Sequence, residues 1–281
     1  MRLLTWNVQW CRGIDGNVDP ARIANVARRM ADFDVLCLQE IAVHFPVLAG
    51  SRGEDQVLAL AALFPAHEAH YGAATDIATG GSARSQFGNL ILSRLPVLQV
   101  YRHSLSWPVD AATPSMPRVA LEAVVQTGKG PVRVTTTHLE YYSALQRNAQ
   151  IEDLRRIHRE ACAHARAPRA GGEGPFAPRP RPASAIFTGD FNLGPRDAGH
   201  ARMGAGFDDG APPLRDAWEV AHPGRPHAPT VGIYERSFSE RPDCFDFIFL
   251  TPDLAARIET VAVDGDTQAS DHQPVMIALR D

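Results

Sequence analysis

Ala185-Ile186-Phe187-Thr188-Gly189-Asp190-Phe191-Asn192 is a short apolar run that ends abruptly in a carboxylate and a carboxamide. Its apolar part is typical of a buried strand, and Gly189 permits a sharp turn of the backbone. Asp190 and Asn192 are two residues apart, so both side chains can leave the strand end on the same side. The stretch alone fits a polar turn that closes a strand as well as it fits a ligand site.

Other predicted strands also carry a polar group at one end. Strands end at Asn7, Glu40, His138 and Asp190, whereas two begin at Asp246 and just after Asp271-His272. If these ends meet at one edge, the last two strands run opposite to the first four, which excludes a fully parallel, doubly wound sheet. One shared site also requires a single domain over residues 1–281. Separate use of each group in turns and caps is the alternative.

The composition is that of a globular protein with a sizeable core. The chain has 281 residues, 44% of them hydrophobic, and a net charge of -4, so no overall basic field draws it to nucleic acid or anionic lipid. The cysteines lack a CxxC spacing and are read as free thiols, which favours a reducing compartment. The sequence predicts no transmembrane segment and no signal peptide, so we expect a cytoplasmic protein without an obligate protein partner.

The first forty residues predict a crossover unit. A strand at Leu3–Val8 precedes a helix that begins with Asp19-Pro20 as its N-terminal cap and first residue. A second buried strand then runs from Val35 to Glu40. Strand, helix, strand in this order leaves Asn7 and Glu40 at the same rim of a sheet.

The middle of the chain predicts antiparallel strands and one long helix. Val97–Leu105 and Arg118–Gln126 alternate as neighbouring strands, and residues 72–86 are expected to form a loop. A long helix is predicted from Leu145 onward, with its arginines (Arg147, Arg155, Arg156 and Arg159) largely on the solvated face. Residues 166–184 are rich in Pro, Gly and Arg, which predicts a flexible connection within one domain.

The polar strand ends are suited to phosphate chemistry. Glu40, Asp271 and Asn7 offer oxygen ligands for a hard cation such as Mg²⁺ or Mn²⁺. His138 and His272 add a base and a donor for phosphoester cleavage. Arg118 fits a phosphate clamp and an exposed strand-end arginine equally well. The other histidines, among them His158, His200 and His227, have no motif around them and are expected mainly at the surface or in loops.

Six short stretches of the sequence, taken in order, resemble the motifs of a known family. The sequence resembles the endonuclease/exonuclease/phosphatase superfamily, which includes pancreatic deoxyribonuclease, inositol polyphosphate 5-phosphatases and neutral sphingomyelinases. The resemblance rests on the ordered stretches Thr5-Trp6-Asn7-Val8, Leu38-Gln39-Glu40, Thr137-His138-Leu139, Gly189-Asp190-Phe191-Asn192, Phe245-Asp246-Phe247-Ile248 and Ser270-Asp271-His272-Gln273-Pro274-Val275. It implies an α+β, four-layer sandwich: two mixed, mostly antiparallel sheets packed face to face, with helices on the outer faces.

The resemblance also implies roles for the matched residues. Glu40 would bind the metal, with Asn7 and Asp271 near or on it, and Asn7 would also contact substrate. Asp190 and Asn192 would orient water and phosphate. Asp246 would hold the His272 ring, and His138 would contact a phosphate oxygen or assist the leaving group. Family members differ over whether the residue matching Asp190 or His272 activates the water, and both remain open. The chain departs from the apurinic endonucleases at Gln9, where they carry a second acid.

The implied activity is hydrolysis of a phosphoester by activated water with Mg²⁺ or Mn²⁺. A phosphodiesterase or nuclease-like enzyme is favoured, acting on nucleic acid, a phospholipid head group or a small phosphodiester. The alternative is a catalytically silent scaffold that binds a phosphorylated ligand or a protein partner.

Overall fold

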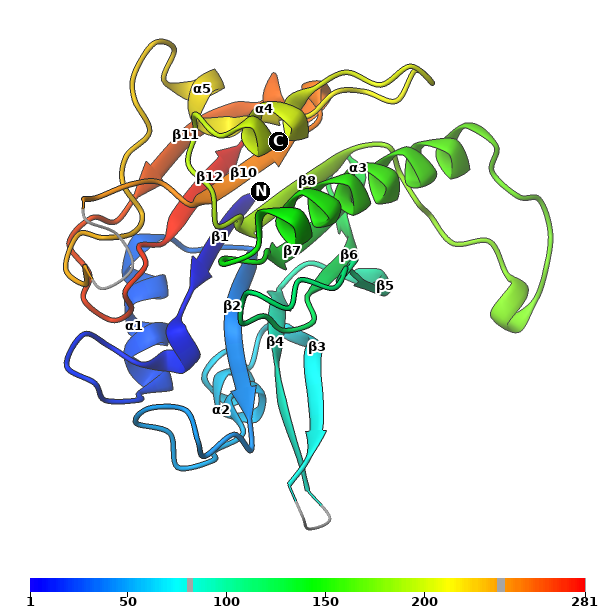
Figure 1. Ribbon diagram of the computed structural model, residues 1–281. Coiled ribbons are helices and arrows are strands. Elements are labelled where there is room, and N and C mark those ends of the chain that lie inside the picture. The colour runs from blue at the N-terminus through cyan, green and yellow to red at the C-terminus, as the bar shows by residue number, and fades with distance from the viewer. Residues whose placement is uncertain (80–82, 237–240, 281) are drawn as a thin grey trace.

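The computed structural model describes residues 1–79, 83–236 and 241–280 (Figure 1). Two six-stranded sheets contain its strands. The first sheet has the order β11 (Ile258–Val263), β12 (Val275–Leu279), β1 (Arg2–Asn7), β2 (Val35–Val43), β4 (Arg84–Ser93), β3 (Glu68–Ala78). The second has the order β5 (Val97–Ser104), β6 (Val119–Thr127), β7 (Gly130–His138), β8 (Ala185–Asp190), β10 (Asp246–Leu250), β9 (Arg215–Asp216). Among the described strand pairs, β1/β2 and β7/β8 are parallel and the others are antiparallel, which confirms mixed, mostly antiparallel sheets.

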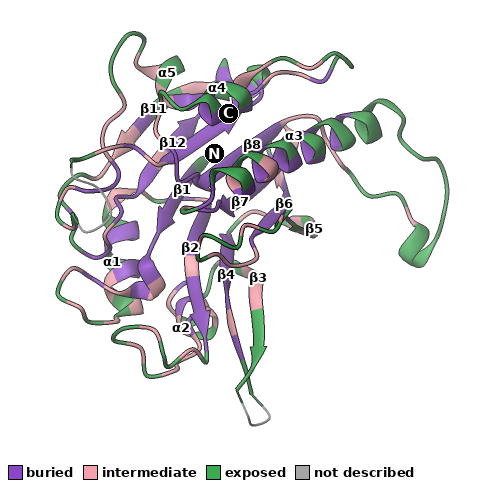
Figure 2. Ribbon diagram, in the orientation of Figure 1, coloured by how far each residue is buried: buried purple, intermediate pink, exposed green. Residues whose placement is uncertain are grey.

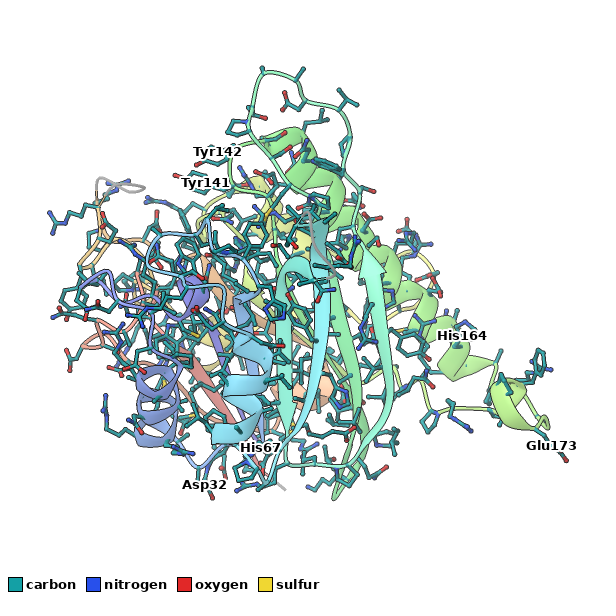
Figure 3. All side chains as sticks on the ribbon, turned by 90° about the horizontal axis from the view of Figure 1, so that it is seen from below. Asp32, His67, Tyr141, Tyr142, His164 and Glu173 are labelled. Atoms are coloured by element: carbon teal, nitrogen blue, oxygen red, sulfur yellow. The ribbon has the colours of Figure 1, made fainter. Side chains whose placement is uncertain are left out.

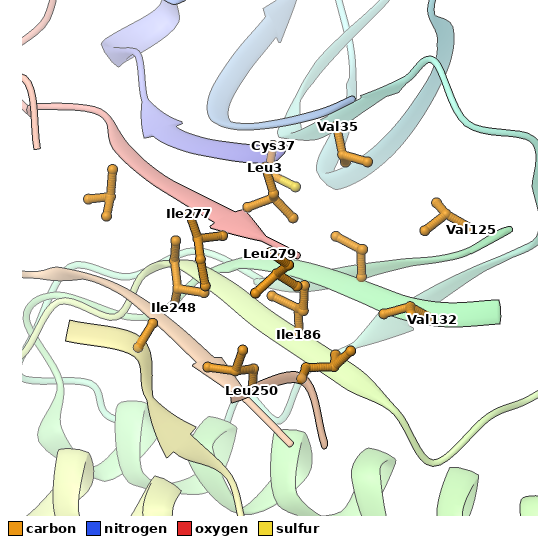
Figure 4. Close-up of a cluster of buried hydrophobic side chains, with 14 of the residues drawn as sticks. Leu3, Val35, Cys37, Val125, Val132, Ile186, Ile248, Leu250, Ile277 and Leu279 are labelled. Carbon is orange, nitrogen blue, oxygen red and sulfur yellow. The ribbon is translucent and has the colours of Figure 1, made fainter. Parts of the chain in front are cut away.

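The two sheets pack face to face around an apolar interior. Alternate residues of each strand point inward, as the two-residue period of a strand requires. Leu3 and Ile277 of the first sheet belong to one buried cluster with Val132, Ile186 and Ile248 of the second (Figure 4). Removal of this apolar surface from water is the main force that holds the sheets together.

Helices cover the outer face of each sheet. On the first sheet lie α1 (Pro20–Met30) and α2 (Gln56–Leu63). The second is covered by α3 (Ala144–Arg166) and α4 (Ala198–Gly204). Figure 2 shows the buried strands between these partly exposed helices. The short elements are η1 (Gln9–Cys11), η2 (Gly174–Phe176), α5 (Ala217–Ala221) and α6 (Pro252–Ala255). The expected four-layer sandwich is therefore confirmed.

The sequence predicted Arg155 on the solvated face of α3, and this is wrong. Arg155 is 4% exposed, and its guanidinium donates hydrogen bonds to the carbonyls of Arg202, Ala205 and Gly206. The last carbonyls of α4 have no partner within that helix, and a buried guanidinium can satisfy several of them at once. Arg155 is thus a structural residue that joins α3 to the end of α4.

The prediction of a loop at residues 72–86 is also wrong. Residues 72–78 belong to β3 and residues 84–86 to β4, while residues 80–82 lie outside the described part of the chain. The small residues reflect close packing here. A Cβ on Gly72 would lie 3.3 Å from Leu121, and one on Gly88 would lie 2.0 Å from the Gly72 carbonyl oxygen. The same residue types that mark loops also permit this approach of two backbones.

The segment between α3 and β8 runs far from the sheets. Figure 3 shows Glu173 at its distant tip, whereas Tyr141 and Tyr142 lie together just before α3. The segment returns at Pro182, whose carbonyl accepts a hydrogen bond from the buried Arg133 side chain. Over the ranges that the structure describes, no helix is both long and apolar enough to cross a bilayer. The four cysteines, Cys11, Cys37, Cys162 and Cys244, are all free and buried.

Gly189→Ala is expected to destabilise the fold strongly. Gly189 has a φ of 131°, and an added Cβ would lie 1.9 Å from the Thr137 carbonyl oxygen of the neighbouring strand. Strain and overlap together should lower the free energy of unfolding by about 3 kcal/mol. Urea denaturation measures the change. Gly128→Ala is the control because nothing lies within 4 Å of its added Cβ; equal effects of the two substitutions would contradict this packing.

Candidate active site

Three strands of the second sheet place polar side chains next to one another. In the register of β7, β8 and β10, His138 pairs with Asp190, and Asp190 pairs with Asp246. Each lies an even number of residues from inward-facing apolar positions of its strand, so all three face the first sheet. The apolar interior of the sandwich therefore ends in a row of polar groups.

The first sheet contributes Asn7 and Glu40 to the same place. Asn7 follows the inward positions of Leu3 and Thr5 on β1. Glu40 reaches the site through a β-bulge, because the pairing of β2 with β4 gains one residue between Leu38 and Ile41. The sequence predicted that this strand ends at Glu40, but it continues to Val43. The bulge turns Glu40 inward without ending the strand.

Two hydrogen bonds anchor the segment that carries Asp271 and His272. The Trp6 indole nitrogen donates to the His272 carbonyl at 2.9 Å, and the Ser270 hydroxyl donates to the Asn7 carbonyl at 2.8 Å. Both partners belong to β1. The C-terminal part of the site is thus fixed to the first strand of the chain.

Hydrogen bonds join these groups into one network. His272 Nδ1 lies 2.8 Å from Asp246 Oδ2, and its Nε2 lies 3.7 Å from Asp190 Oδ2. The Asn7 amide donates to Glu40 Oε1 at 3.0 Å and to Asp190 Oδ2 at 2.9 Å. The other Asp190 oxygen accepts from the Asn192 backbone at 2.9 Å. Both carboxylate oxygens of Asp190 are therefore held in fixed directions.

His138, Asn192 and Arg118 border this network. His138 Nε2 lies 3.5 Å from Asp190 Oδ2, and its Nδ1 lies 3.8 Å from Glu40 Oε1. The Asn192 amide donates to the Leu139 carbonyl. Arg118 is 7% exposed, so it is a buried residue, and Nη1 of its guanidinium is buried without a hydrogen-bond partner. All the residues named from the sequence thus lie in or beside one cluster.

Two residues at the site, Gln9 and Glu140, were not among the site residues predicted from the sequence, although Gln9 was noted as a departure from the apurinic endonucleases. The Gln9 amide donates to Asp271 Oδ2 at 2.7 Å, so the residue that replaces an acid still contacts the acidic cluster. Glu140 is fully buried and accepts hydrogen bonds from Arg118 Nε and Nη2 at 3.3 and 3.2 Å. The only available hint for Glu140 was its position two residues after His138.

The backbone is strained at several site residues. Gln9, Glu40 and Asn192 have φ values of 46°, 60° and 51°, a region that side chains other than glycine seldom adopt. Each such conformation costs on the order of 1–3 kcal/mol and persists only where the surroundings enforce it. The strained backbone conformations therefore orient these side chains at a cost in local stability.

The environment shifts several pKa values. Burial, together with the charge of Asp271, raises the pKa of Glu40 to about 7, and burial raises the pKa of Asp190 to about 6. Burial alone would lower the pKa of His272, but the charges of Asp246 and Asp190 raise it well above its usual value. Burial, with Arg118 and His272 nearby, lowers the pKa of His138 well below its usual value.

The acidic groups fit a divalent cation. Within the described residues, Glu40 and Asp271 accept hydrogen bonds only from neutral side chains, of Asn7, Gln9 and Ser270. Burial and the charge of Asp271 oppose ionisation of Glu40, and the imidazole of His138, 3.8 Å from Glu40 Oε1, is neutral, so a bound cation would stabilise the ionised carboxylates. Carboxylate oxygens are the ligands that hard cations prefer. Asp190, Asp246 and His272 also present ligand atoms within 4.8 Å of one another, but His272 and Asp246 already form a hydrogen-bonded pair.

Comparison with known proteins agrees with this geometry. A model described as "Endonuclease/Exonuclease/phosphatase family" matches residues 4–272. A solved endonuclease/exonuclease/phosphatase from Beutenbergia cavernae DSM 12333 is 27% identical, with 100% of this chain and 71% of that chain covered and a TM-score of 0.69. A comparison with curated proteins finds no match.

Two further solved structures share the fold at lower identity. An endonuclease/exonuclease/phosphatase from Bacteroides vulgatus is 18% identical, covers 99% of this chain and 98% of its own, and has a TM-score of 0.69. A mannosyl-6-phosphatase from Bacteroides thetaiotaomicron is 17% identical, covers 100% of both chains, and has a TM-score of 0.66. Together with the family match, the site supports metal-dependent hydrolysis of phosphoesters as the general class of chemistry. The chain belongs to the endonuclease/exonuclease/phosphatase family.

Proposed function

We propose that the protein hydrolyses phosphodiesters with Mg²⁺ or Mn²⁺, in the manner of a nuclease. The observation that carries this proposal is the convergence of Glu40 and Asp271 with Asp190 and the His272–Asp246 pair. Among the described side chains assigned to the site, four are carboxylates (Glu40, Asp190, Asp246 and Asp271) and two, His272 and Arg118, are cationic. A singly charged diester therefore meets less repulsion than a dianionic monoester, which favours the diester.

Glu40 and Asp271, with Asn7 beside them, would hold the cation. When bound, it would neutralise charge on the phosphate and make the water easier to deprotonate. Asn7 donates to both Glu40 and Asp190, so it sets the distance between the cation site and the base.

Asp190 is the better candidate for the base. Its pKa of about 6 leaves it ionised at neutral pH, whereas His272, held by Asp246, stays protonated and cannot accept a proton. The charged His272 would instead stabilise negative charge on the phosphate. His138 is neutral and would donate a hydrogen bond to a phosphate oxygen or to the leaving group. Asn192, whose backbone fixes Asp190, would help orient water and phosphate.

Arg118→Lys is expected to weaken substrate binding more than turnover. We propose that the unpartnered Nη1 of Arg118 contacts the phosphate, while Glu140 holds the rest of the guanidinium. Lysine keeps the charge but loses the forked geometry. KM should rise about 10- to 100-fold, the effect of losing one charged hydrogen bond. Steady-state kinetics measures this, with Arg94→Lys as control because Arg94 pairs with Asp32 and Asp34 at the exposed surface. An unchanged KM would remove Arg118 from the phosphate site.

The carboxylates of the metal-free site should contribute less stability as the pH rises. Glu40 and Asp190 keep protons in the folded state up to about pH 7 and 6, above the range in which the unfolded chain releases them. At these two groups the folded state therefore binds more protons between about pH 4 and 7, and their contribution to stability falls across that window, whereas the lowered pKa values of His138 and His158 act in the opposite direction. The raised pKa of His272 acts in the same direction as the two carboxylates, because its stabilisation is lost as the pH rises through the folded-state pKa.

A divalent cation should cancel this loss. Melting temperatures measured with EDTA and with Mg²⁺ should differ little near pH 5 and increasingly toward pH 8, because the cation competes with protons for the carboxylates. Equal stabilisation by Mg²⁺ at both pH values would contradict the assigned ligands.

The proposed function is tested by a substrate screen with each metal. Purified protein with Mg²⁺ or Mn²⁺ is incubated with bis-p-nitrophenyl phosphate, single- and double-stranded nucleic acid, phospholipids and a sugar phosphate monoester. We expect cleavage of at least one diester class and weaker cleavage of the monoester. Preference for the monoester would overturn the diester assignment. Failure to cleave any substrate with either metal would overturn the enzymatic function.

A further inference from the structure

A second cluster of metal-ligating side chains lies apart from the site described above. His200 Nε2 lies 2.8 Å from Asp216 Oδ2, and His227 Nε2 lies 2.9 Å from the same oxygen. His200 belongs to α4, Asp216 precedes α5, and His227 lies in the following loop. The ligand atoms lie within 4.8 Å of one another. Three separate parts of the chain thus converge on one point.

The cluster is buried and its members are fixed in orientation. The side chains of Asp216, His200 and His227 are 3%, 8% and 9% exposed. Asp216 Oδ1 accepts from the Trp218 backbone at 2.7 Å, which leaves Oδ2 to the two imidazoles. The His200 ring packs 4.9 Å from Phe247, and the His227 ring stacks 6.1 Å from Trp218. The sequence placed His200 and His227 among the surface or loop histidines, and this is wrong for the buried His200.

A small cavity adjoins the cluster. Its volume is about 10 Å³, and Asp216, His227, Thr230 and Cys244 are among the residues that line it. A space of this size is at the lower limit for one water molecule, and its other lining residues, among them Phe247, Ile248 and Val275, are apolar. Asp216 and His227 are the members of the cluster that border it.

We propose that His200, Asp216 and His227 form a second metal site, which takes Zn²⁺ and completes its coordination with water. Two imidazole nitrogens and one carboxylate oxygen are a ligand set that Zn²⁺ favours, in contrast to the oxygen-rich set at Glu40 and Asp271. Ligand atoms around a zinc ion stand roughly 3.0–3.5 Å apart, given metal–ligand distances near 2.1 Å. The two spacings to Asp216, 2.8 and 2.9 Å, are shorter, so these ligand atoms would move apart by about half an ångström on binding, and the two imidazole nitrogens lie within 4.8 Å of each other.

The proposed metal would stabilise the loop that contacts the start of β10, where Asp246 lies. His227 lies three residues before Thr230, whose hydroxyl accepts hydrogen bonds from the backbones of Phe245 and Asp246 at 3.0 and 3.2 Å. The Thr230 carbonyl also accepts from the Gln273 backbone, directly after His272. The metal would link α4, the start of α5 and this loop, so its role is structural and its binding is independent of the proposed hydrolysis.

A hydrogen-bonded cluster without metal is the competing explanation, in which both imidazoles donate Nε2–H to Asp216. His227→Gln separates the two explanations. A glutamine amide can replace the imidazole as a hydrogen-bond donor, but it is a poor ligand for zinc. His222→Ala is the matched control, because His222 lies on the same stretch and its ring contacts the Val261 carbonyl instead of the cluster.

The experiment measures metal content by mass spectrometry after dialysis against zinc, and the visible spectrum after cobalt substitution. It uses the full chain with Glu40→Gln and Asp271→Asn, so that the other acidic site does not contribute. We expect about one equivalent of zinc and the strong absorption of tetrahedral cobalt. His227→Gln and His200→Ala should lower zinc affinity at least about tenfold, whereas His222→Ala should not. Absent zinc, or unchanged zinc affinity in a folded His227→Gln protein, would overturn the proposal.

Discussion

Asp190→Asn is expected to lower kcat by about 10³-fold, the range associated with loss of a positioned general base. The substitution keeps the size of the side chain and removes the negative charge. Asp190 is held by the Asn7 amide and by the Asn192 backbone, so the loss would reflect its chemistry more than its packing. KM should change little, because the phosphate contacts assigned to Arg118 and His138 remain.

The pH profile adds a second readout for Asp190. In the wild-type protein, kcat/KM should rise with pH as Asp190 loses its proton, at or below about 6 because a bound cation favours the ionised carboxylate. This limb should disappear in Asp190→Asn. Asp76→Asn is the matched control, since Asp76 pairs with Arg84 on the exposed part of β3. A loss of less than about tenfold would shift the main role of base to His272.

Glu40→Gln should show the second large effect, a loss of activity of about 100-fold or more with a higher metal concentration needed for half-maximal rate. Glutamine keeps the shape of the side chain but is a weaker ligand for a hard cation. The same change should stabilise the metal-free protein above about pH 7, because it removes a buried charge whose pKa is raised to about 7.

The combination of lower activity and higher metal-free stability distinguishes a functional carboxylate from a structural one. Steady-state rates over a range of Mg²⁺ concentrations and melting curves in EDTA measure the two effects. Glu68→Gln, on exposed β3, serves as control. A Glu40→Gln protein that is less stable in EDTA at pH 8, yet fully active, would contradict the assignment of Glu40 as a metal ligand.

The strand ends that carry polar groups could be predicted from local sequence, because apolar runs end or begin at Asn7, His138, Asp190 and Asp246. The opposite direction of the last two strands followed from which end carried the polar group. Both features depend on local sequence, which one chain displays in full. The four-layer sandwich and the roles of the site residues were instead implied by the resemblance to a known family.

Features that depend on contacts between distant residues could not be predicted. The bulge that turns Glu40 inward depends on the pairing of β2 with β4, and no residue type within the bulge indicates it. Gln9 and Asp271 are 262 residues apart in sequence. His200, Asp216 and His227 belong to three unremarkable stretches that meet only in the folded chain. Small residues at Gly72 and Gly88 mark close packing as readily as a loop.

We propose that strand ends between residues 7 and 272 create one divalent-cation site. Calorimetric titration of Mn²⁺ and Mg²⁺ into the metal-free protein tests it most directly, with Glu40→Gln and Asp271→Asn beside the wild type. We predict saturable binding that both substitutions weaken and that Asp76→Asn leaves unchanged. Absence of binding by either metal to the folded wild-type protein would contradict the claim and favour a silent scaffold that binds a phosphorylated ligand.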